Sequence, residues 1–391
     1  MKVLVVGSGG REHAICWKLA QSPHVEELYC APGNGGIAEV ARCVPIAATD
    51  VQAVTAWAGE QKMDFVVVAP DDPLALGMVD ALEAAGIPAF GPRQNAAMIE
   101  ASKIFSKDLM AKYHIPTAAY RSFTDREQAL AYVAEQGAPI VVKADGLALG
   151  KGVIVAQSVE EAQQTVRDMM DGGRFGAAGA KVVVEECMTG PEVTVLAFCD
   201  GEHLVCMPSS QDHKRAFDGN RGPNTGGMGA ISPSPYYTPE IARRCMEEIF
   251  QPTVAALRSE GRPFQGVIYF GLMLTPGGPR VVEYNARFGD PECQAVLSLL
   301  DSDLMEIFLA CREGRLDTLD IRWKGGAACC LVLASGGYPG PYVKGLPITG
   351  LKQAEETAVV FHAGTKRGED GGVRTNGGRV LGVTALGENL E

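Results

Sequence analysis

The segment VVEYNARFGDPE, residues 281–292, contains the residue types that most clearly suggest chemistry. Its first half reads as a strand, and side chains alternate between the two faces of a strand, so Glu283, Asn285 and Arg287 are expected on one face. Such a polar row is costly in a core, where an unpaired charge destabilises the fold. Carboxylate and amide oxygens are ligands for Mg²⁺, and a guanidinium pairs with an anion. The row predicts a magnesium and phosphate site in preference to a row of surface salt bridges.

A glycine-rich loop joins two expected strands in VVKADGLALGKGVIV, residues 141–155. It differs from the phosphate loop of the Walker type, because a strand and not a helix follows it. A hairpin of this kind can fold over a triphosphate, with Lys143 and Lys151 as point charges. Taken alone, a surface hairpin with solvated lysines explains the segment equally well.

Carboxylates lie at the end of another expected strand in KVVVEECMTGPEV, residues 181–193. Glu185, Glu186 and Glu192 can accept hydrogen bonds from an amino group or from ribose hydroxyls. Exposed glutamates at strand ends are common, so this segment alone is a weak indication of nucleotide binding.

The glycine turn GSGGREHA, residues 7–14, follows the first expected strand and opens a helix. A dinucleotide-binding turn needs glycine at its sixth position, which Glu12 occupies, and no acidic residue ends the second strand. A hydride-transfer enzyme is therefore disfavoured. Free backbone N–H groups at Gly9 and Gly10 can bind an anion at the helix N-terminus, although a tight turn alone explains the segment equally well.

Residues 211–230, QDHKRAFDGNRGPNTGGMGA, combine many glycines and basic residues with almost no hydrophobic side chains. A long loop without secondary structure is uncommon in a compact domain and is usually either functional or disordered. These residues alone leave that choice open.

The elements that must position these residues fall into three regions. Residues 1–101 alternate apolar strands, such as VLVVG and DFVVVAP, with helices, which indicates a doubly wound parallel sheet covered on both faces. A second region, 102–325, begins with a helix that Ser102 caps and continues with several strands and one helix near 293–312. A smaller α/β region, 326–391, follows.

Composition excludes several classes of protein. The chain has 391 residues, too many for one ordinary core, and its net charge of -12 gives no diffuse footprint for nucleic acid. A small phosphorylated ligand held by local groups is favoured. The 11 cysteines lack zinc-type spacing, so reduced thiols are expected. The amino terminus shows no basic-then-apolar leader and no apolar run has the length of a bilayer, so we expect a cytoplasmic protein without a membrane partner.

The chain resembles the ATP-grasp superfamily in four motifs that occur in order, VVKADGLALGKGV, VVVEE, QDHKR with GPNTGGMGA, and EYNARFGDPE. GGREHA, QDHKR and PNTGGMGA are specific to one family within it, phosphoribosylamine-glycine ligase. Likeness at GGYPG, FHAGT and TNGGRVLGVTALG extends the resemblance over nearly the whole chain. It implies an α+β ATP-grasp domain at 102–325, with a small mobile subdomain at about 117–190. The family continues with a helical segment after TALG, so 326–391 is expected to be an incomplete C-terminal domain.

This resemblance implies a reaction. Glycine is joined to 5-phosphoribosylamine with the use of ATP: the glycine carboxylate attacks the γ-phosphate, and the amine then displaces phosphate from the glycyl phosphate. The products are glycinamide ribonucleotide, ADP and phosphate, in de novo purine biosynthesis. The expected cofactors are ATP and Mg²⁺ or Mn²⁺. The expected partners are these small molecules, with no nucleic acid, and the expected state is a monomer.

The resemblance also assigns roles to residues. Glu283 and Asn285 match the family's metal ligands, and Arg287 is expected to steady the acyl phosphate as charge develops. For Lys107, a solvated helix face stays an equal alternative to a role in the site. The expected nucleotide-binding set is Lys103, Lys143, Lys151, Glu185, Glu186 and Glu192.

Residues 211–230 resemble the family's acceptor loop beside the γ-phosphate, in which glycines let the backbone approach the acyl phosphate closely. Asp212 and Lys214 are expected to act in catalysis, with Asp212 helping to hold the glycine amine. Asp71 stands where the family usually has glutamate, which leaves its contact with phosphoribosylamine open. The expected substrate-binding set is Gly9, Gly10, Asp212, Asn224, Thr225, Gly226 and Arg287.

Two other functions stay open at this point. One is another ATP-grasp ligase with a different acceptor, and the other is a nucleotide sensor without activity. A sensor has no need of the set Glu283, Asn285, Arg287 and Lys143, which argues against it. We further expect the hairpin at 144–152 and its subdomain to close over ATP, because an acyl phosphate must be shielded from water.

Overall fold

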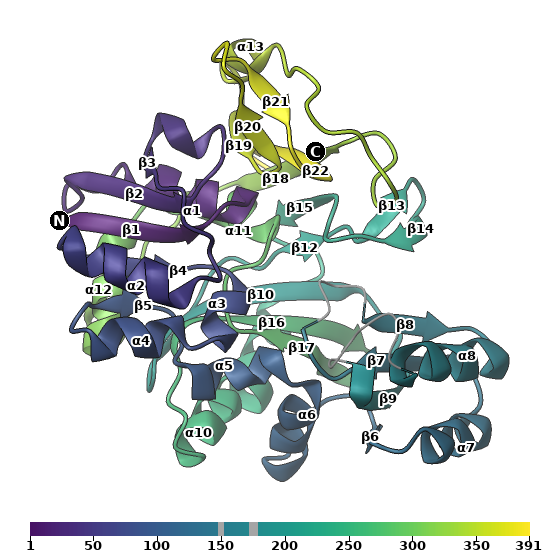
Figure 1. Cartoon of the computed structure of the whole chain (residues 1–391). Helices are drawn as coiled ribbons and strands as arrows, with labels where there is room; N and C mark the ends of the chain where they lie inside the picture. Colours follow the sequence, from purple (N-terminus) through teal and green to yellow (C-terminus); the bar gives the residue numbers. More distant parts are fainter. Residues whose placement is uncertain (148–151, 172–178) are drawn as a thin grey trace.

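The computed structural model describes residues 1–147, 152–171 and 179–391 (Figure 1). Its N-terminal part is a parallel five-stranded sheet of order β3-β2-β1-β4-β5. The central strands β1 and β4 are almost wholly buried, as expected for a sheet covered on both faces. The predicted doubly wound α/β domain is therefore confirmed. Its strands are β1 (Lys2–Gly7), β2 (Glu27–Pro32), β3 (Arg42–Cys43), β4 (Phe65–Val68) and β5 (Ala89–Phe90).

The helices of this part begin close to the carboxyl ends of the strands, which is the edge where open α/β folds bind ligands. Gly9 precedes the first helix, and Pro70 precedes the third. The helices are α1 (Gly10–Leu19), α2 (Val51–Glu60), α3 (Asp71–Ala75), α4 (Met78–Ala84) and α5 (Gln94–Ala101).

The middle of the chain contains an antiparallel sheet of order β11-β10-β16-β17, which carries the candidate site. Around it lie α6 (Lys103–Lys112), α9 (Pro239–Cys245), α10 (Gln251–Ser259), α11 (Glu292–Leu299) and α12 (Leu304–Glu313). The single helix expected near 293–312 is in fact two, because Asp303 caps α12 by accepting from Met305 N. The strands are β10 (Glu192–Asp200), β11 (Leu204–Cys206), β16 (Gln265–Thr275) and β17 (Gly278–Asn285).

A second antiparallel sheet, of order β6-β9-β7-β8, packs against two helices on one side of the molecule (Figure 1). It has a hydrophobic core of its own, formed with residues of both helices. Separate cores of this kind are typical of subdomains. The elements are β6 (Tyr120–Phe123), β7 (Ile140–Ala144), β8 (Val153–Ala156), β9 (Val182–Glu186), α7 (Arg126–Gln136) and α8 (Val159–Met170).

Residues 211–230 are not a structureless loop, which corrects the expectation from the sequence. They form two short strands that flank the hairpin β13 (Arg215–Phe217) and β14 (Arg221–Asn224). The flanking strands join the C-terminal sheet, whose order is β12-β15-β18-β22-β19. These strands are β12 (Gln211–Asp212), β15 (Gly229–Ser232), β18 (Ala327–Ala334), β19 (Val359–His362) and β22 (Arg379–Gly387).

Buried polar contacts hold the N-terminal and C-terminal parts together. The His362 N–H donates to His13 Nδ1 over 2.7 Å, which requires an unprotonated Nδ1. A further buried contact joins the N-terminal part to the middle of the chain, where the Lys18 ammonium donates to Leu300 O over 2.6 Å. Smaller elements of the C-terminal part are α13 (Leu351–Ala354), β20 (Thr365–Arg367) and β21 (Val373–Thr375). Among the helices of the described ranges, none has the length and apolar character needed to span a bilayer.

Candidate active site

Strand β17 presents the predicted polar row. Glu283 and Asn285 are partly exposed, whereas the intervening Tyr284 is buried, so the two polar side chains share the open face. A bulge in the pairing of β16 with β17 leaves Val282 as an extra residue beside Glu283. The Val282 carbonyl accepts from the Lys143 ammonium over 3.1 Å, so the bulge ties the row to strand β7.

The electrostatic surroundings of Glu283 favour a charged carboxylate. Burial opposes ionisation, but the ammonium groups of Lys214, Lys143 and Lys103 outweigh it and lower the pKa of Glu283. The Asn285 Nδ2 donates to Tyr284 O over 2.8 Å, which leaves the amide oxygen to act as a ligand. An ionised carboxylate beside an amide oxygen suits a divalent cation, and the surrounding lysines suit a polyphosphate, so these residues fit Mg-ATP.

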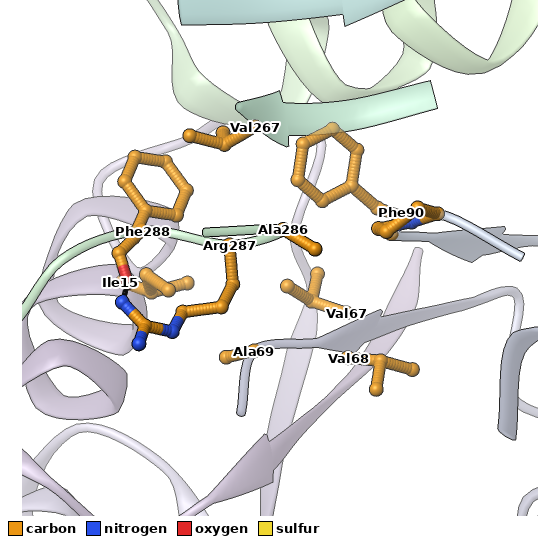
Figure 2. Close-up of a pocket in the computed structure, with 11 residues that line it drawn as sticks. Ile15, Val67, Val68, Ala69, Phe90, Val267, Ala286, Arg287 and Phe288 are labelled. Carbon is orange, nitrogen blue, oxygen red and sulfur yellow. Dashed lines mark hydrogen bonds between the residues drawn. The ribbon is translucent and has the colours of Figure 1, made fainter. Parts of the chain in front are cut away.

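Arg287 lies beyond the last residue of β17, so it is not part of the strand face that the sequence predicts. Its guanidinium pairs with Glu100 of α5, with 2.8 Å between Nη2 and Oε1. Figure 2 shows Arg287 between Ile15 and Ala69, at the carboxyl end of β4. Arg287 therefore links the candidate metal site to the N-terminal domain.

Two further residues of the N-terminal domain lie near Arg287. Burial raises the pKa of Asp71, but Arg287 and Arg11 outweigh it and lower this pKa. Arg11 donates from Nε to Glu12 over 2.5 Å and from Nη1 to Phe288 O over 3.1 Å. Sequence reasoning missed Arg11 as a site residue. The sequence feature that could have indicated Arg11 is a positive charge in the first turn of a helix, where the helix dipole disfavours it.

The Gly9 backbone N–H is not free, which corrects the expectation of an open anion site at the start of α1. It donates to Glu12 Oε2 over 2.6 Å, and the Arg11 N–H donates to Asp290 Oδ2 over 3.1 Å. A Cβ at Gly10 would meet the end of the Gln294 side chain, so Gly10 packs closely against α11. Ligand binding at Gly9 and Gly10 stays a prediction.

Three charged side chains from different elements meet in the interior. Glu185 Oε2 of β9 lies 3.0 Å from Lys143 Nζ of β7 and 3.1 Å from Lys107 Nζ of α6. Burial lowers the pKa of Lys107 to about 8, although Glu185 opposes the shift. The solvated face considered for Lys107 is wrong, since the residue is 2% exposed. Glu185 is likewise a buried ion-pair partner and not an exposed strand-end carboxylate.

The remaining residues of the predicted nucleotide set are spread around this triad. Lys103 Nζ donates to Gly146 O over 3.2 Å, at the start of the predicted hairpin. Burial lowers the pKa of Lys103, and Glu283 opposes this. Glu186 is exposed and pairs with Arg280. Lys151 and part of the hairpin 144–152 lie outside the described residues.

The acceptor segment, residues 211–230, brings Asp212 and Lys214 toward Glu283. Burial raises the pKa of Asp212, with Lys214 opposing and the carboxylates Glu192 and Glu283 adding to it. Lys214 Nζ lies 3.0 Å from Glu192 Oε2. Burial disfavours its charge, yet Asp212 and its neighbours raise the pKa of Lys214 well above the usual value.

The C-terminal end of the acceptor segment is a tight turn, and its polar groups form hydrogen bonds within the segment itself. Thr225 N donates to Lys214 O over 2.7 Å, and the Thr225 hydroxyl donates to the same oxygen over 2.9 Å. The Gly227 N–H donates to the Thr225 hydroxyl over 3.0 Å. Asn224 is exposed at the end of β14, opposite Arg215. Binding roles for Asn224, Thr225 and Gly226 stay predictions.

Glu292 is a buried carboxylate beside the acceptor segment that sequence reasoning missed. The Tyr269 hydroxyl donates to Glu292 Oε1 over 2.9 Å and accepts from the Thr194 hydroxyl over 3.0 Å. Burial, together with Asp212, raises the pKa of Glu292 to about 7. The sequence offered only its place in GDPE, because its partners lie on β16 and β10.

This raised pKa makes a prediction about stability. The pKa of Glu292 is about 7 in the folded state and near 4.3 in an unfolded chain. The stability that this difference adds to the folded state is therefore fully present below pH 4.3 and is lost as pH rises through 7. Glu292→Gln keeps the acceptor for Tyr269 but removes the titration. Urea unfolding should therefore show that the free energy of unfolding of wild type falls relative to that of the variant between pH 5 and pH 8, by up to about 3 kcal/mol. A parallel pH course in both proteins would contradict the assignment.

Comparison with known proteins decides the family. Three models of the phosphoribosylglycinamide synthetase family match the chain: the N domain at residues 1–100, the ATP-grasp (A) domain at 101–293 and the C domain at 328–391. The chain belongs to this family. It is thus an ATP-grasp carbon–nitrogen ligase, of a family that uses ATP and a divalent metal ion.

Individual relatives of this family member are similar over the whole chain. The phosphoribosylamine–glycine ligase of Vibrio vulnificus (strain CMCP6) is 52% identical over 394 residues, which cover 100% of this chain and 92% of the relative. The crystal structure of the phosphoribosylamine–glycine ligase from Thermotoga maritima has a TM-score of 0.86 at 33% identity, covering 100% of this chain and 93% of that one.

A more distant structure shares only the fold. The biotin carboxylase domain of 2-oxoglutarate carboxylase from Hydrogenobacter thermophilus, solved with MgADP, ADP and bicarbonate, has a TM-score of 0.74 at 15% identity. The match covers 99% of this chain and 86% of that one. This likeness supports the ATP-grasp architecture that the sequence motifs indicated.

Proposed function

We propose that this enzyme joins glycine to 5-phosphoribosylamine in de novo purine biosynthesis, through a glycyl phosphate, with release of ADP and phosphate. The observation that carries the proposal is the position of Glu283, which lies between the nucleotide lysines and the acceptor segment. The names of relatives that are about half identical over the whole chain support the choice of substrates.

The proposed nucleotide site uses charged side chains that the fold already holds in position. Lys103 and Lys143 neutralise phosphate oxygens, with Glu186 and Glu192 on the adenine and ribose side. Glu283 and Asn285 hold the divalent ion, Mg²⁺ or Mn²⁺. When bound, the ion offsets the charge of the phosphate oxygens that react. Fixed charges that need no rearrangement are the most effective way to lower such a barrier.

The proposed acceptor side holds the two reacting amino compounds. Asp212 accepts hydrogen bonds from the glycine ammonium, and Lys214 faces the carboxylate that attacks ATP. Arg287 steadies the acyl phosphate and is oriented by Glu100. The attack by glycine and the attack by the amine both require the reacting groups to be aligned. Binding the reactants in one site supplies this alignment at a lower entropic cost than collision in solution.

The test is release of ADP and phosphate from Mg-ATP, measured with glycine, with phosphoribosylamine generated in the assay, and with both. We expect full turnover only with both and little turnover when alanine or bicarbonate replaces glycine. Turnover with another carboxylate or amine would keep the ligase and overturn the substrates. ATP binding without amine-dependent phosphate release would instead indicate a nucleotide sensor.

A further inference from the structure

The C-terminal domain contacts the acceptor segment at one turn, residues 224–228, which we name the acceptor turn. Arg379, the first residue of β22, donates from Nη1 to Gly226 O over 2.8 Å and to Gly227 O over 3.3 Å. From the same domain, the Tyr338 hydroxyl accepts from the Gly226 N–H over 3.2 Å. Both the carbonyl and the N–H of Gly226 are thus bonded to side chains of the C-terminal domain.

Arg379 also reaches the connection that follows strand β17. Its Nη1 donates to Asp290 O over 2.7 Å and lies 3.4 Å from Asp290 Oδ1. The other carboxylate oxygen of Asp290 accepts from the Arg11 N–H of α1. One guanidinium therefore joins the C-terminal domain, the β17–α11 connection and the first helix of the chain. Hydrogen bonds from a charged donor are stronger than those between neutral groups.

The glycines of the acceptor turn pack closely against this guanidinium and against Pro291. A Cβ at Gly226 would lie 3.2 Å from Arg379 Cζ. Gly227 has a φ of +108°, and a Cβ there would lie 2.6 Å from Pro291 Cδ. The turn is packed between Arg379 and the residues that follow Asp290, so removing the guanidinium removes its outer support.

On its inner side, the acceptor turn is hydrogen-bonded to a proposed catalytic residue, Lys214. Two donors of Thr225 bond to the Lys214 carbonyl. The Lys214 ammonium in turn pairs with Glu192 and faces Asp212. A displacement of the turn would therefore move the backbone of Lys214, and small misplacements of this kind are costly in catalysis.

We propose that Arg379 is a positioning residue for the acceptor side of the reaction. It acts through the acceptor turn on Lys214 and Asp212, and it touches neither the lysines nor the carboxylates of the nucleotide site. The proposal rests on the proposed function, because it assigns the acceptor segment to glycine. It predicts that the C-terminal domain affects glycine use more strongly than ATP binding.

The experiment compares Arg379→Ala, Arg379→Lys and a control, Arg374→Ala, which removes a partly exposed arginine of the same domain that pairs with Asp370. For Arg379→Ala we expect the KM for glycine to rise about 10- to 100-fold, the effect of losing hydrogen bonds to a charged group. The KM for ATP should rise several-fold less than the KM for glycine, because only the pair of Lys214 with Glu192 connects the turn to the proposed nucleotide site. Low-millimolar guanidinium should restore part of the glycine KM, whereas the lysine variant should not recover it, since its ammonium lacks the planar fork.

Equal KM values for glycine in wild type and Arg379→Ala would overturn the proposal. So would a parallel rise in both KM values that guanidinium leaves unchanged, because that pattern indicates general loss of structure. Tyr338→Phe, which removes the acceptor of the Gly226 N–H, gives the same readout should Arg379→Ala fail to fold. Wild type without glycine-dependent turnover would refute the proposed function instead, and the KM comparison would then use the carboxylate that wild type accepts.

Discussion

Glu283→Gln is expected to lower turnover by about 100- to 1,000-fold, the cost of removing one preorganised charged contact from an active site. Glutamine keeps the shape of the side chain but lacks the charge that binds a divalent cation. It also leaves the ammonium groups of Lys214, Lys143 and Lys103 without the carboxylate that they surround. The measurement is the rate of ADP release at saturating substrates, over a range of Mg²⁺ concentrations.

Glu247→Gln is a matched control for this variant. Glu247 pairs with Arg243 on an exposed helix face, where such a pair contributes little. We expect the control to keep the wild-type rate, and circular dichroism should show an unchanged fold in both variants. A Glu283→Gln enzyme with the full rate would remove Glu283 from the proposed metal site.

Glu185→Gln is expected to destabilise the apoenzyme by about 3–5 kcal/mol, the range found when a buried ion pair loses one partner. In wild type, one carboxylate stands between the ammonium groups of Lys107 and Lys143. The variant removes the carboxylate that pairs directly with both buried lysines. Urea unfolding without nucleotide measures the loss.

Lys143→Met separates this structural effect from nucleotide binding. It leaves Lys107 and Glu185 as a neutral pair, so it should cost less stability than Glu185→Gln. It should nevertheless raise the KM for ATP by about tenfold or more, because the removed ammonium is the one that also contacts the metal-site strand through Val282 O. If Glu185→Gln were as stable as Lys143→Met, the charge of Glu185 would not be what stabilises Lys107 and Lys143 in the interior.

The shared face of Glu283 and Asn285 was recoverable from sequence because it depends only on strand periodicity. Glu283 and Asn285 are two residues apart, and this spacing alone places them on one face. The parallel N-terminal sheet was recoverable for a similar reason, since its strands are short, apolar and buried on both faces. Local pattern was enough in each case.

Other parts of the site depend on contacts between distant segments, which no local pattern encodes. Glu185 reads as a strand-end carboxylate, and only the fold brings Lys107 from α6 onto it. Glu292 becomes a perturbed carboxylate because the fold buries it and brings Asp212 near it. Residues 211–230 look structureless because the strands within them are short and one of them, β15, pairs with β18 far along the chain.

That last pairing has a consequence for how the molecule folds. Strand β15 pairs with β18 through Ala230 and Cys330, Ile231 and Cys329, and their neighbours, so the acceptor segment completes its sheet with a strand made about 100 residues later. Pairing over such a distance must overcome a large loop-closure entropy and tends to form late. We therefore expect one edge of β15 to stay unpaired during synthesis until β18 has been made, and unpaired strand edges are sites of aggregation.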